Sequence, residues 1–393
     1  MTMPGLASGP LPHTASVVVV GGGIAGIAAA YELARRGVRD VVVCEAGYPG
    51  VGASGRNGEL VRSAFASREW ATLCDLSLRA WQTLSDELGA NTLFTRAGYI
   101  VLATGDSQVE LCRRSVERHR ELGILPTNGV DEADIRRLLP ALAPGYARGG
   151  FYQRDGGYAH HDATMWAYVQ AAARLGVRIH AGVIVHGIAV SAAGAVTGVQ
   201  TSAGDIATPV VLDAAGGRAR EVAALAGVAI PTETQRLEAL VTESVAPFLR
   251  PGVALLDALG YCHQTSRGEF VGGTEIPGAP MPDTMQTSFR GLVDAARKFT
   301  AAFPVLRGVR VIRQWAGIVD TTPDFAPILG RAPGVDGLWL DCGWGYGFMA
   351  GPGAGKVMAE AIATGVVPPA MAPFAVERFA RGEPIAEGSI VVA

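Results

Sequence analysis

The feature that most constrains this chain is a glycine-rich turn near its N-terminus. Val17–Val20 is an apolar run without polar alternation, which is typical of a strand buried on both faces of a parallel sheet. The turn Gly21–Gly26, read G-G-G-I-A-G, follows at once, and a helical pattern extends over 24–36. A second apolar run, Val41–Cys44, ends at Glu45. This order of strand, turn, helix, strand and acid predicts a dinucleotide-binding unit.

Three glycines of the turn are explained by the geometry of dinucleotide binding. Gly21 permits the tight turn, Gly23 lets a pyrophosphate approach the backbone, and Gly26 allows close packing of helix against strand. The helix begins at Ile24 and Ala25, so free N–H groups and the positive end of the helix dipole face the phosphates. The alternative is a glycine-rich turn in an unrelated α/β fold.

The acid at the end of the second strand narrows the choice of nucleotide. Glu45 lies 24 residues beyond Gly21 and can accept hydrogen bonds from ribose hydroxyls. A carboxylate repels a 2′-phosphate, which argues against NADP at this site.

Composition excludes several classes of function. The 393 residues allow two domains, and 49% hydrophobic with 18% charged residues excludes a disordered chain. A net charge of −3 gives no electrostatic case for binding nucleic acid or an anionic membrane. The five cysteines form no C-x-x-C pair, which predicts reduced thiols and no metal site. The first sixteen residues hold no Lys or Arg, so we expect a cytoplasmic protein whose residues 1–14 are a disordered tail.

The loop after Glu45 points to a flavin rather than a nicotinamide nucleotide. Gly50–Gly58, read G-V-G-A-S-G-R-N-G, and then Leu60–Ser63 resemble the loop beside the flavin in the D-amino-acid oxidase superfamily of FAD enzymes. Further segments are similar to that superfamily in the same order, namely 210–217, 317–330 and 338–349. The segments 159–168, 260–269 and 342–345 are most similar to the beta subunits of heterotetrameric sarcosine oxidases. Together these segments extend from about residue 16 to 365.

The resemblance implies an α/β fold with a discontinuous Rossmann-like FAD-binding domain. We expect that domain over 15–80, 150–225 and 315–393. The inserted pieces 81–149 and 226–314 then form an α+β substrate domain on a mixed or antiparallel sheet. Helical spacing occurs around Trp81 and over 109–122, 289–303 and 375–381, and strands are expected over 255–274. The Pro-rich tail 366–393 is expected at the surface.

The resemblance also implies the flavin contacts. A helix opening at Gly351 is expected to direct its positive end at the flavin pyrimidine ring. The cysteine that binds FAD covalently in monomeric relatives is missing from Trp315–Ile318, so noncovalent FAD is expected. Beyond the first turn and Glu45, the implied contacts are Ala53, Ser54, Arg56, Asn57, Gly58, Val185, Ala215, Gly216, Gly345, Gly347, Phe348 and Met349.

His161 matches the residue that carries a covalent FMN in the heterotetrameric enzymes. The neighbouring His160 replaces an arginine of that family. The alternative, which we favour, is a turn residue before a helix over 163–175 with Asp162 as the N-cap.

Four residues are candidates for the reaction itself. Arg62 matches an arginine that binds the substrate carboxylate, and a guanidinium suits bidentate binding. Tyr261 and His263 lie on a predicted strand over the flavin. His263 could equally be a buried histidine of the core with no part in the reaction. Met349 stands near the position of a carboxylate-binding lysine and brings bulk without charge.

The resemblance implies an amine or amino-acid oxidase of the sarcosine type. Hydride passes to the flavin, the imine hydrolyses, and oxygen accepts the electrons as hydrogen peroxide. The oxygen-activating lysine of monomeric relatives aligns near Phe270, which leaves open a dehydrogenase subunit that passes electrons to a partner protein. A flavin hydroxylase lacks support because 212–216 holds no Asp-Gly pair. A disulfide reductase needs a C-x-x-C that is absent, and a non-enzymatic FAD-binding protein remains an alternative.

Overall fold

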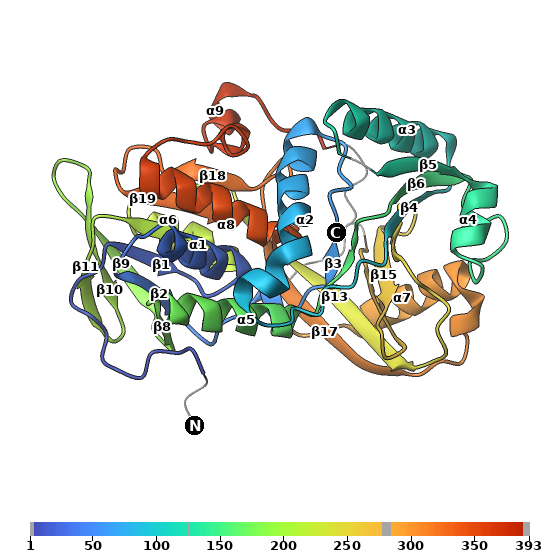
Figure 1. Cartoon of the computed structure of the whole chain (residues 1–393), viewed down its shortest axis with the longest axis horizontal. Helices are drawn as coiled ribbons and strands as arrows, with labels where there is room; N and C mark the ends of the chain where they lie inside the picture. The colour runs from blue at the N-terminus through green and yellow to red at the C-terminus, as the bar shows by residue number, and fades with distance from the viewer. Residues whose placement is uncertain (1–3, 125, 277–283, 388–393) are drawn as a thin grey trace.

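Two sheets lie side by side and divide the molecule into two regions (Figure 1). The computed structural model describes residues 4–124, 126–276 and 284–387. The first region is built on a six-stranded sheet in the order β18-β19-β12-β1-β2-β8, in which only β18 is antiparallel to its neighbour. Its strands are β1 (Val17–Val20), β2 (Val41–Glu45), β8 (Arg178–Ala181), β12 (Val211–Asp213), β18 (Ile328–Arg331) and β19 (Leu338–Cys342).

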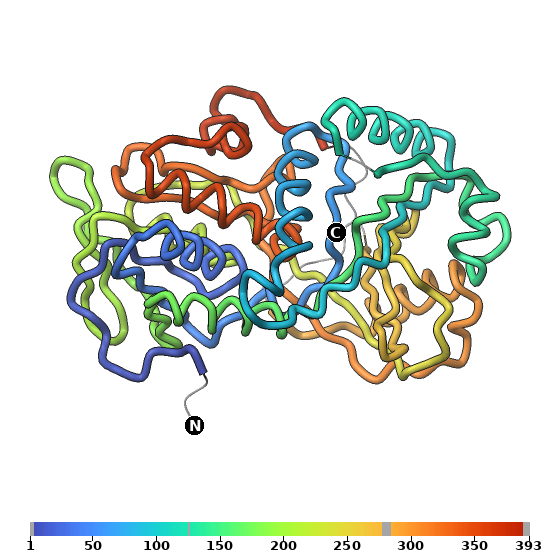
Figure 2. The backbone as a smooth tube through the Cα atoms, viewed as in Figure 1, coloured from blue at the N-terminus to red at the C-terminus, as the bar shows by residue number. Residues whose placement is uncertain are grey.

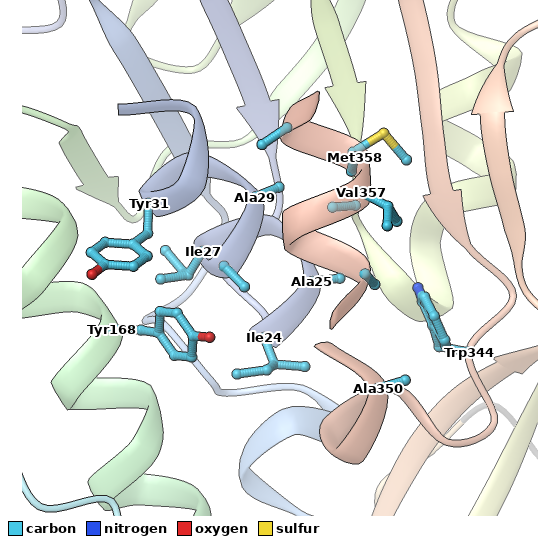
Figure 3. Packing of buried hydrophobic residues seen from close by; sticks show 14 of the residues in the cluster. Ile24, Ala25, Ile27, Ala29, Tyr31, Tyr168, Trp344, Ala350, Val357 and Met358 are labelled. Carbon is cyan, nitrogen blue, oxygen red and sulfur yellow. The ribbon is translucent and has the colours of Figure 1, made fainter. Parts of the chain in front are cut away.

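The six-stranded sheet is covered on both faces, which explains why β1 is apolar at every position. Val17 and Val19 pack with the helices of one face, whereas Val18 and Val20 pack with the other layer. The helices of the first face are α1 (Ile24–Arg35), α2 (Arg68–Leu88), α5 (His161–Arg174) and α8 (Gly347–Thr364). The other layer holds β9 (Val185–Val190), β10 (Val196–Thr201), β11 (Gly204–Ala207) and α6 (Ala219–Ala224). In Figure 3, Ile24 and Ala25 of α1 lie beside Ala350 and Val357 of α8.

The second region is a mixed sheet of eight strands in the order β17-β13-β16-β15-β14-β4-β6-β5. All its pairs are antiparallel except β14 with β4. Phe270 of this sheet packs on Phe299 of α7 (Phe289–Ala302), and Val101 packs with Val116 of α3 (Asp106–Glu121). The strands are β4 (Tyr99–Ala103), β5 (Thr127–Asp131), β6 (Gly149–Gln153), β13 (Glu233–Ser244), β14 (Gly252–Leu255), β15 (Gly260–Gln264), β16 (Glu269–Thr274) and β17 (Val311–Thr321).

Smaller elements complete the fold. The pair β3 (Leu60–Val61) with β7 (Gly157–Tyr158) lies where the chain passes between the two regions, as the tube in Figure 2 also shows. The others are α4 (Glu132–Leu138), α9 (Arg378–Arg381), η1 (Ala53–Gly55), η2 (Gly216–Arg218), η3 (Pro304–Leu306) and η4 (Ala372–Phe374). Two regions of this kind confirm the expected fold class. Among the described residues, no helix has the length and apolar character that crossing a bilayer requires.

Three expected boundaries cut through elements of the structure. Helix α2 continues past residue 80, because its Trp81 remains packed against α8 of the six-stranded region. Strand β6 begins at Gly149 and pairs within the eight-stranded sheet, so the expected piece 150–225 starts inside a strand of the other region. Strand β17 begins at Val311, before the expected boundary at 315, because it pairs with β13.

Both ends of the chain hold more structure than expected. Residues 4–14 are not a disordered tail, since the amide of Ala7 donates to the carbonyl oxygen of Ile179 at 2.9 Å and Leu6 packs on the core. Residues 1–3 lie outside the described part of the chain. The tail after 366 is not confined to the surface, because Arg378 is buried in an ion pair with Asp324 at 2.8 Å.

Two helix starts also differ from expectation. Helix α8 begins at Gly347 rather than Gly351 and includes Pro352. Helix α5 begins at His161, and the side chain of His160, not Asp162, accepts the N-capping hydrogen bond from the amide of Ala163. An imidazole nitrogen can serve as the acceptor in place of a carboxylate.

Candidate cofactor and substrate site

One cavity of about 810 Å³ lies at the carboxyl ends of β1, β2, β12 and β19 and extends toward the eight-stranded sheet. This edge is where ligands bind in open parallel sheets. Of the predicted cofactor contacts, all but Gly26 line the cavity. They are Gly21, Gly23, Ile24, Ala25, Glu45, Ala53, Ser54, Arg56, Asn57, Gly58, Val185, Ala215, Gly216, Gly345, Gly347, Phe348 and Met349.

The part of the wall formed by Gly21, 23–25, Glu45, 53–54, 214–217, Asp320 and Asp341 is here called the cofactor wall, and around Gly21 it is shaped by backbone. Gly21 has a φ of 110°, and a Cβ there would lie 2.4 Å from the carbonyl oxygen of Ala214. A Cβ on Gly26 would lie 2.2 Å from the carbonyl oxygen of Gly21, which is why Gly26 sits behind the wall. The N-cap Gly23 brings no side chain to the start of α1, so an anionic phosphate group can approach there.

Glu45 is fixed at the edge of this wall. Its Oε2 accepts from the amide of Gly22 at 2.7 Å, and its Oε1 accepts from the amide of Gly47 at 2.6 Å. Both bonds orient the carboxylate where β2 ends, which fits an acid that accepts from ribose hydroxyls.

Two buried acids in the wall were missed by sequence reasoning. Asp341 Oδ1 accepts from the indole of Trp344 at 2.6 Å, and Asp320 Oδ1 accepts from the backbone amide of Trp344 at 3.2 Å. Within the described residues Asp341 Oδ2 is buried without a hydrogen-bond partner, and burial raises the pKa of Asp341 to about 7. An unpaired buried oxygen in a cavity wall fits a ligand that carries hydroxyl groups, such as the ribityl chain of FAD.

Another part of the wall, called the substrate wall, is formed by 58–60, Arg62, Tyr99, Tyr261 and 346–349. Arg62 is 4% exposed, and its guanidinium carbon lies 4.3 Å from the ring centre of Phe65, 5.1 Å from Tyr99 and 5.4 Å from Tyr346. Its Nη1 donates to the carbonyl oxygen of Ala64 at 3.1 Å. Across the described ranges Arg62 forms no ion pair.

The segment after Arg62 is held by a residue from the far end of the sequence. Glu387 accepts from the amide of Ala66 at 2.6 Å and from the amide and hydroxyl of Ser67 at 2.9 and 2.5 Å. Burial raises the pKa of Glu387 to about 7. The contact joins positions 320 residues apart, so no local pattern could have predicted it.

Tyr261 and Met349 lie in the substrate wall as predicted. A Cβ on Gly58 would lie 2.0 Å from the ring of Tyr261, so Gly58 permits the close approach of this phenol. Burial raises the pKa of Tyr261 to about 12, which keeps its hydroxyl a donor at neutral pH. The carbonyl oxygen of Met349 accepts from the hydroxyl of Ser77 at 2.6 Å and from the indole of Trp81 at 2.9 Å.

His263 lies behind the wall rather than in it. It is 0% exposed, does not line the cavity, and stacks on Tyr158 with the ring centres 4.5 Å apart. Burial lowers the pKa of His263 to about 4. Its Nε2 lies 3.7 Å from Glu59 Oε2, and Nδ1 of His161 lies 3.0 Å from Glu59 Oε1. Over the described residues there is no cluster of three or more side chains suited to a metal ion.

Comparison with known proteins agrees with this geometry. A family model described as "DAO: FAD dependent oxidoreductase" matches residues 16–361. The chain is 33% identical to the sarcosine oxidase subunit beta of Rhodobacter capsulatus over 377 residues, which cover 94% of this chain and 90% of the relative. It is 35% identical to the protein of the same name from Rhizobium meliloti, with 95% and 90% covered. The crystal structure of L-proline dehydrogenase from P. horikoshii superposes with a TM-score of 0.89 at 28% identity, covering 95% of this chain and all of that one.

Proposed function

The chain belongs to the DAO family of FAD-dependent oxidoreductases, and from this premise we propose that it oxidises a secondary amine that carries a carboxylate, such as an N-substituted glycine. FAD-dependent oxidation of a C–N bond in an amine or amino acid is the activity that its relatives support. Oxygen as the electron acceptor and hydrogen peroxide as its product belong to the proposal.

The observation that carries the proposal is that Arg62 lines the cavity and is buried. The buried guanidinium of Arg62 is compensated by three aromatic rings, one backbone carbonyl and the charge of the nearby Glu387, but in the described structure it forms no direct ion pair, so a ligand carboxylate would add one. Arg62 lines the cavity, and a guanidinium can bind a carboxylate in a bidentate manner. A substrate with a carboxylate therefore fits this wall better than a simple alkylamine.

Other residues of the substrate wall would orient and shield that substrate. The neutral phenol of Tyr261 would donate a hydrogen bond to the carboxylate. Met349 and Phe348 supply apolar surface for the N-substituent or side chain and help to exclude water. FAD, when bound, supplies the two-electron acceptor for the hydride.

We propose that the cofactor wall holds FAD noncovalently. The start of α1, where the amide of Ile24 donates to Ser54 Oγ at 2.9 Å, would face its pyrophosphate, Glu45 its ribose and Asp341 its ribityl chain. A second flavin on His161 is not part of the proposal, because the ring of His161 lies against Glu59. All five cysteines are free and buried, which supports a cytoplasmic location.

The second candidate is a dehydrogenase that passes electrons to a partner subunit. Phe270 stands where oxidases of the monomeric type place a lysine, and it is fully buried against Phe299. Similarity to a protein named L-proline dehydrogenase and to proteins named subunit beta favours this reading.

An anaerobic titration of the flavoprotein tests both candidates. The flavin spectrum is recorded while sarcosine, L-proline, glycine and N-ethylglycine are added in turn, and air is then admitted. Bleaching that recovers quickly in air with formation of peroxide supports the oxidase. Bleaching that persists in air supports the dehydrogenase, and the absence of bleaching with every amine contradicts both.

A further inference from the structure

The substrate wall contains a buried acid, Glu59, to which sequence reasoning gave no role. Glu59 lines the cavity, is 9% exposed, and has a φ of 63°. Left-handed backbone is rare for a glutamate and persists only where surrounding contacts hold it. Here the amide of Glu59 donates to Asn57 Oδ1 at 2.7 Å, and its carbonyl oxygen accepts from the amide of Ala159 at 2.8 Å. The carboxylate is thus held in one place.

A line of titratable side chains leads from Glu59 to the surface. Glu59 Oε1 lies 3.0 Å from His161 Nδ1. On the other side of the ring, His161 Nε2 lies 3.6 Å from Asp162 Oδ1, and the side chain of Asp162 is 67% exposed. The imidazole therefore stands between a carboxylate in the cavity wall and one in solvent. Within the described residues its Nδ1 has no aligned hydrogen-bond partner, and 3.6 Å to Asp162 is too long for a hydrogen bond, so a proton shuttle along this line requires the ring to rotate.

The groups around Glu59 hold its side chain in the ionised, carboxylate form. They are His160, His161 and Asp162 at the start of α5, Tyr158 of β7 and His263 of β15. Burial acts to raise the pKa of Glu59, but the contact with His161 lowers it, and the result is a pKa below the usual value. Burial also raises the pKa of the Tyr158 phenol, so Tyr158 stays neutral.

His263 does not provide a second exit. Its ring is fully buried and stacks on Tyr158, and within the described residues neither of its nitrogens has a hydrogen-bond partner. Its low pKa leaves it neutral at physiological pH. The exit by way of His161 differs in that its ring has a second neighbour, Asp162, whose side chain is exposed to solvent.

We propose that Glu59 is the base that takes the proton from the substrate ammonium group, and that His161 carries this proton to Asp162 and solvent. The proposal rests on the proposed amine oxidation. The N–H bond breaks, an O–H bond forms on Glu59, and the electron pair stays on nitrogen. The free lone pair would then let the neighbouring carbon give up its hydride to the two-electron acceptor that FAD would supply when bound, which leaves the substrate as an iminium ion. The proton on Glu59 passes to His161 Nδ1, and the imidazole releases its other proton from Nε2.

The test compares the rate of anaerobic flavin bleaching of wild type and Glu59→Gln from pH 6 to 10. The amide keeps the shape of the side chain but cannot accept the proton. Because alkylammonium groups have a pKa of about 10, the variant must use the free amine, whose fraction rises about tenfold per pH unit. We expect Glu59→Gln to be about a thousandfold slower at pH 7 and to approach the wild-type rate near pH 10. The wild-type rate should change little over this range.

Three controls separate this role from a structural one. Acetate offers a carboxylate without an amine, and its perturbation of the flavin spectrum should give the same Kd for Glu59→Gln as for wild type. His161→Gln should slow steady-state turnover while leaving the first anaerobic bleaching unchanged. His186→Gln, which changes an exposed histidine of β9, should match wild type in every measurement.

Four outcomes would overturn the proposal. The first is a Glu59→Gln variant whose rate is as independent of pH as that of wild type. The second is a wild-type rate that itself rises tenfold per pH unit, because the enzyme would then need no base. The third is a flavin attached covalently to His161, detected by mass spectrometry. The fourth is a wild type that no amine bleaches at any pH, which would also overturn the proposed function.

Discussion

The cofactor wall and the substrate wall enclose one cavity but are built in different ways. The cofactor wall is shaped by backbone from short stretches of sequence, and at Gly21 and Gly26 no side chain has room. The substrate wall is made of side chains from distant segments, such as Arg62, Tyr261 and Met349. A backbone wall tolerates little change, whereas a side-chain wall can be altered one residue at a time.

The largest effect is expected for Gly26→Ala. The added methyl group would lie 2.2 Å from the carbonyl oxygen of Gly21, so the turn must shift away from the phosphate position. We expect the purified variant to retain under about a tenth of the wild-type FAD, measured as the ratio of flavin to protein absorbance.

Gly129→Ala is the matched control in the other region. Gly129 lies on β5, and a Cβ there would meet nothing within 4 Å. Its FAD content should equal that of wild type. Equal FAD content in both variants would show that the cofactor wall can accommodate an added methyl group and is not rigid.

A large but selective effect is expected for Arg62→Met. Methionine keeps apolar volume against Phe65 and Tyr346 but removes the charge that would bind a carboxylate. Loss of a charge-assisted bond of about 2–3 kcal/mol predicts a fall in kcat/KM of about a hundredfold for carboxylate substrates, mostly through KM.

The selectivity is checked with an amine that lacks a carboxylate. Its kcat/KM should be nearly the same for Arg62→Met and wild type, and an equal hundredfold loss would mean that Arg62 does not recognise the carboxylate. Arg79→Met, at an exposed position of α2, serves as the control.

A moderate effect of pH on stability is expected from Asp341. Burial raises its folded pKa to about 7, above the ordinary 3.8, so the folded protein binds this proton more tightly than the unfolded chain. The stabilisation is complete at low pH and is lost as pH rises toward and through 7. Relative to Asp341→Asn, which cannot titrate, wild type should lose about 2 kcal/mol of unfolding free energy from pH 5 to 8. Urea unfolding at both pH values measures this, and parallel pH profiles would contradict it.

The smallest effect is expected for Met349→Leu. The side chain lies in the substrate wall, whereas its structural hydrogen bonds with Ser77 and Trp81 use the backbone carbonyl oxygen. A swap of similar apolar volume usually costs under about 1.5 kcal/mol, so KM should change only a few-fold and FAD content not at all. Loss of FAD from this variant would show that a side chain of the substrate wall is also needed to bind the cofactor.

The sequence predicted the cofactor wall better than the substrate wall. The unbroken valines of β1 and the spacing from Gly21 to Glu45 depend on local geometry, so they predicted the cofactor wall. The contact of Glu387 with Ala66 and Ser67 could not be predicted, because it joins positions 320 residues apart, and the burial of Asp341 depends on the strands that pack around β19. His263 shares a strand with Tyr261, yet only the tertiary packing of Tyr158 places it outside the cavity.

The position of β19 has a consequence for how the protein is made. Leu338–Cys342 pairs with β12 and β18 in the sheet that carries the cofactor wall. A ribosome adds about 5–20 residues per second, so most of the chain emerges before this strand can join its sheet. Until then the backbone N–H and C=O groups on one edge of β12 are unpaired, and they can pair with strands of other nascent chains. Slower synthesis of the last part of the chain lengthens this interval and should therefore lower the yield of soluble protein.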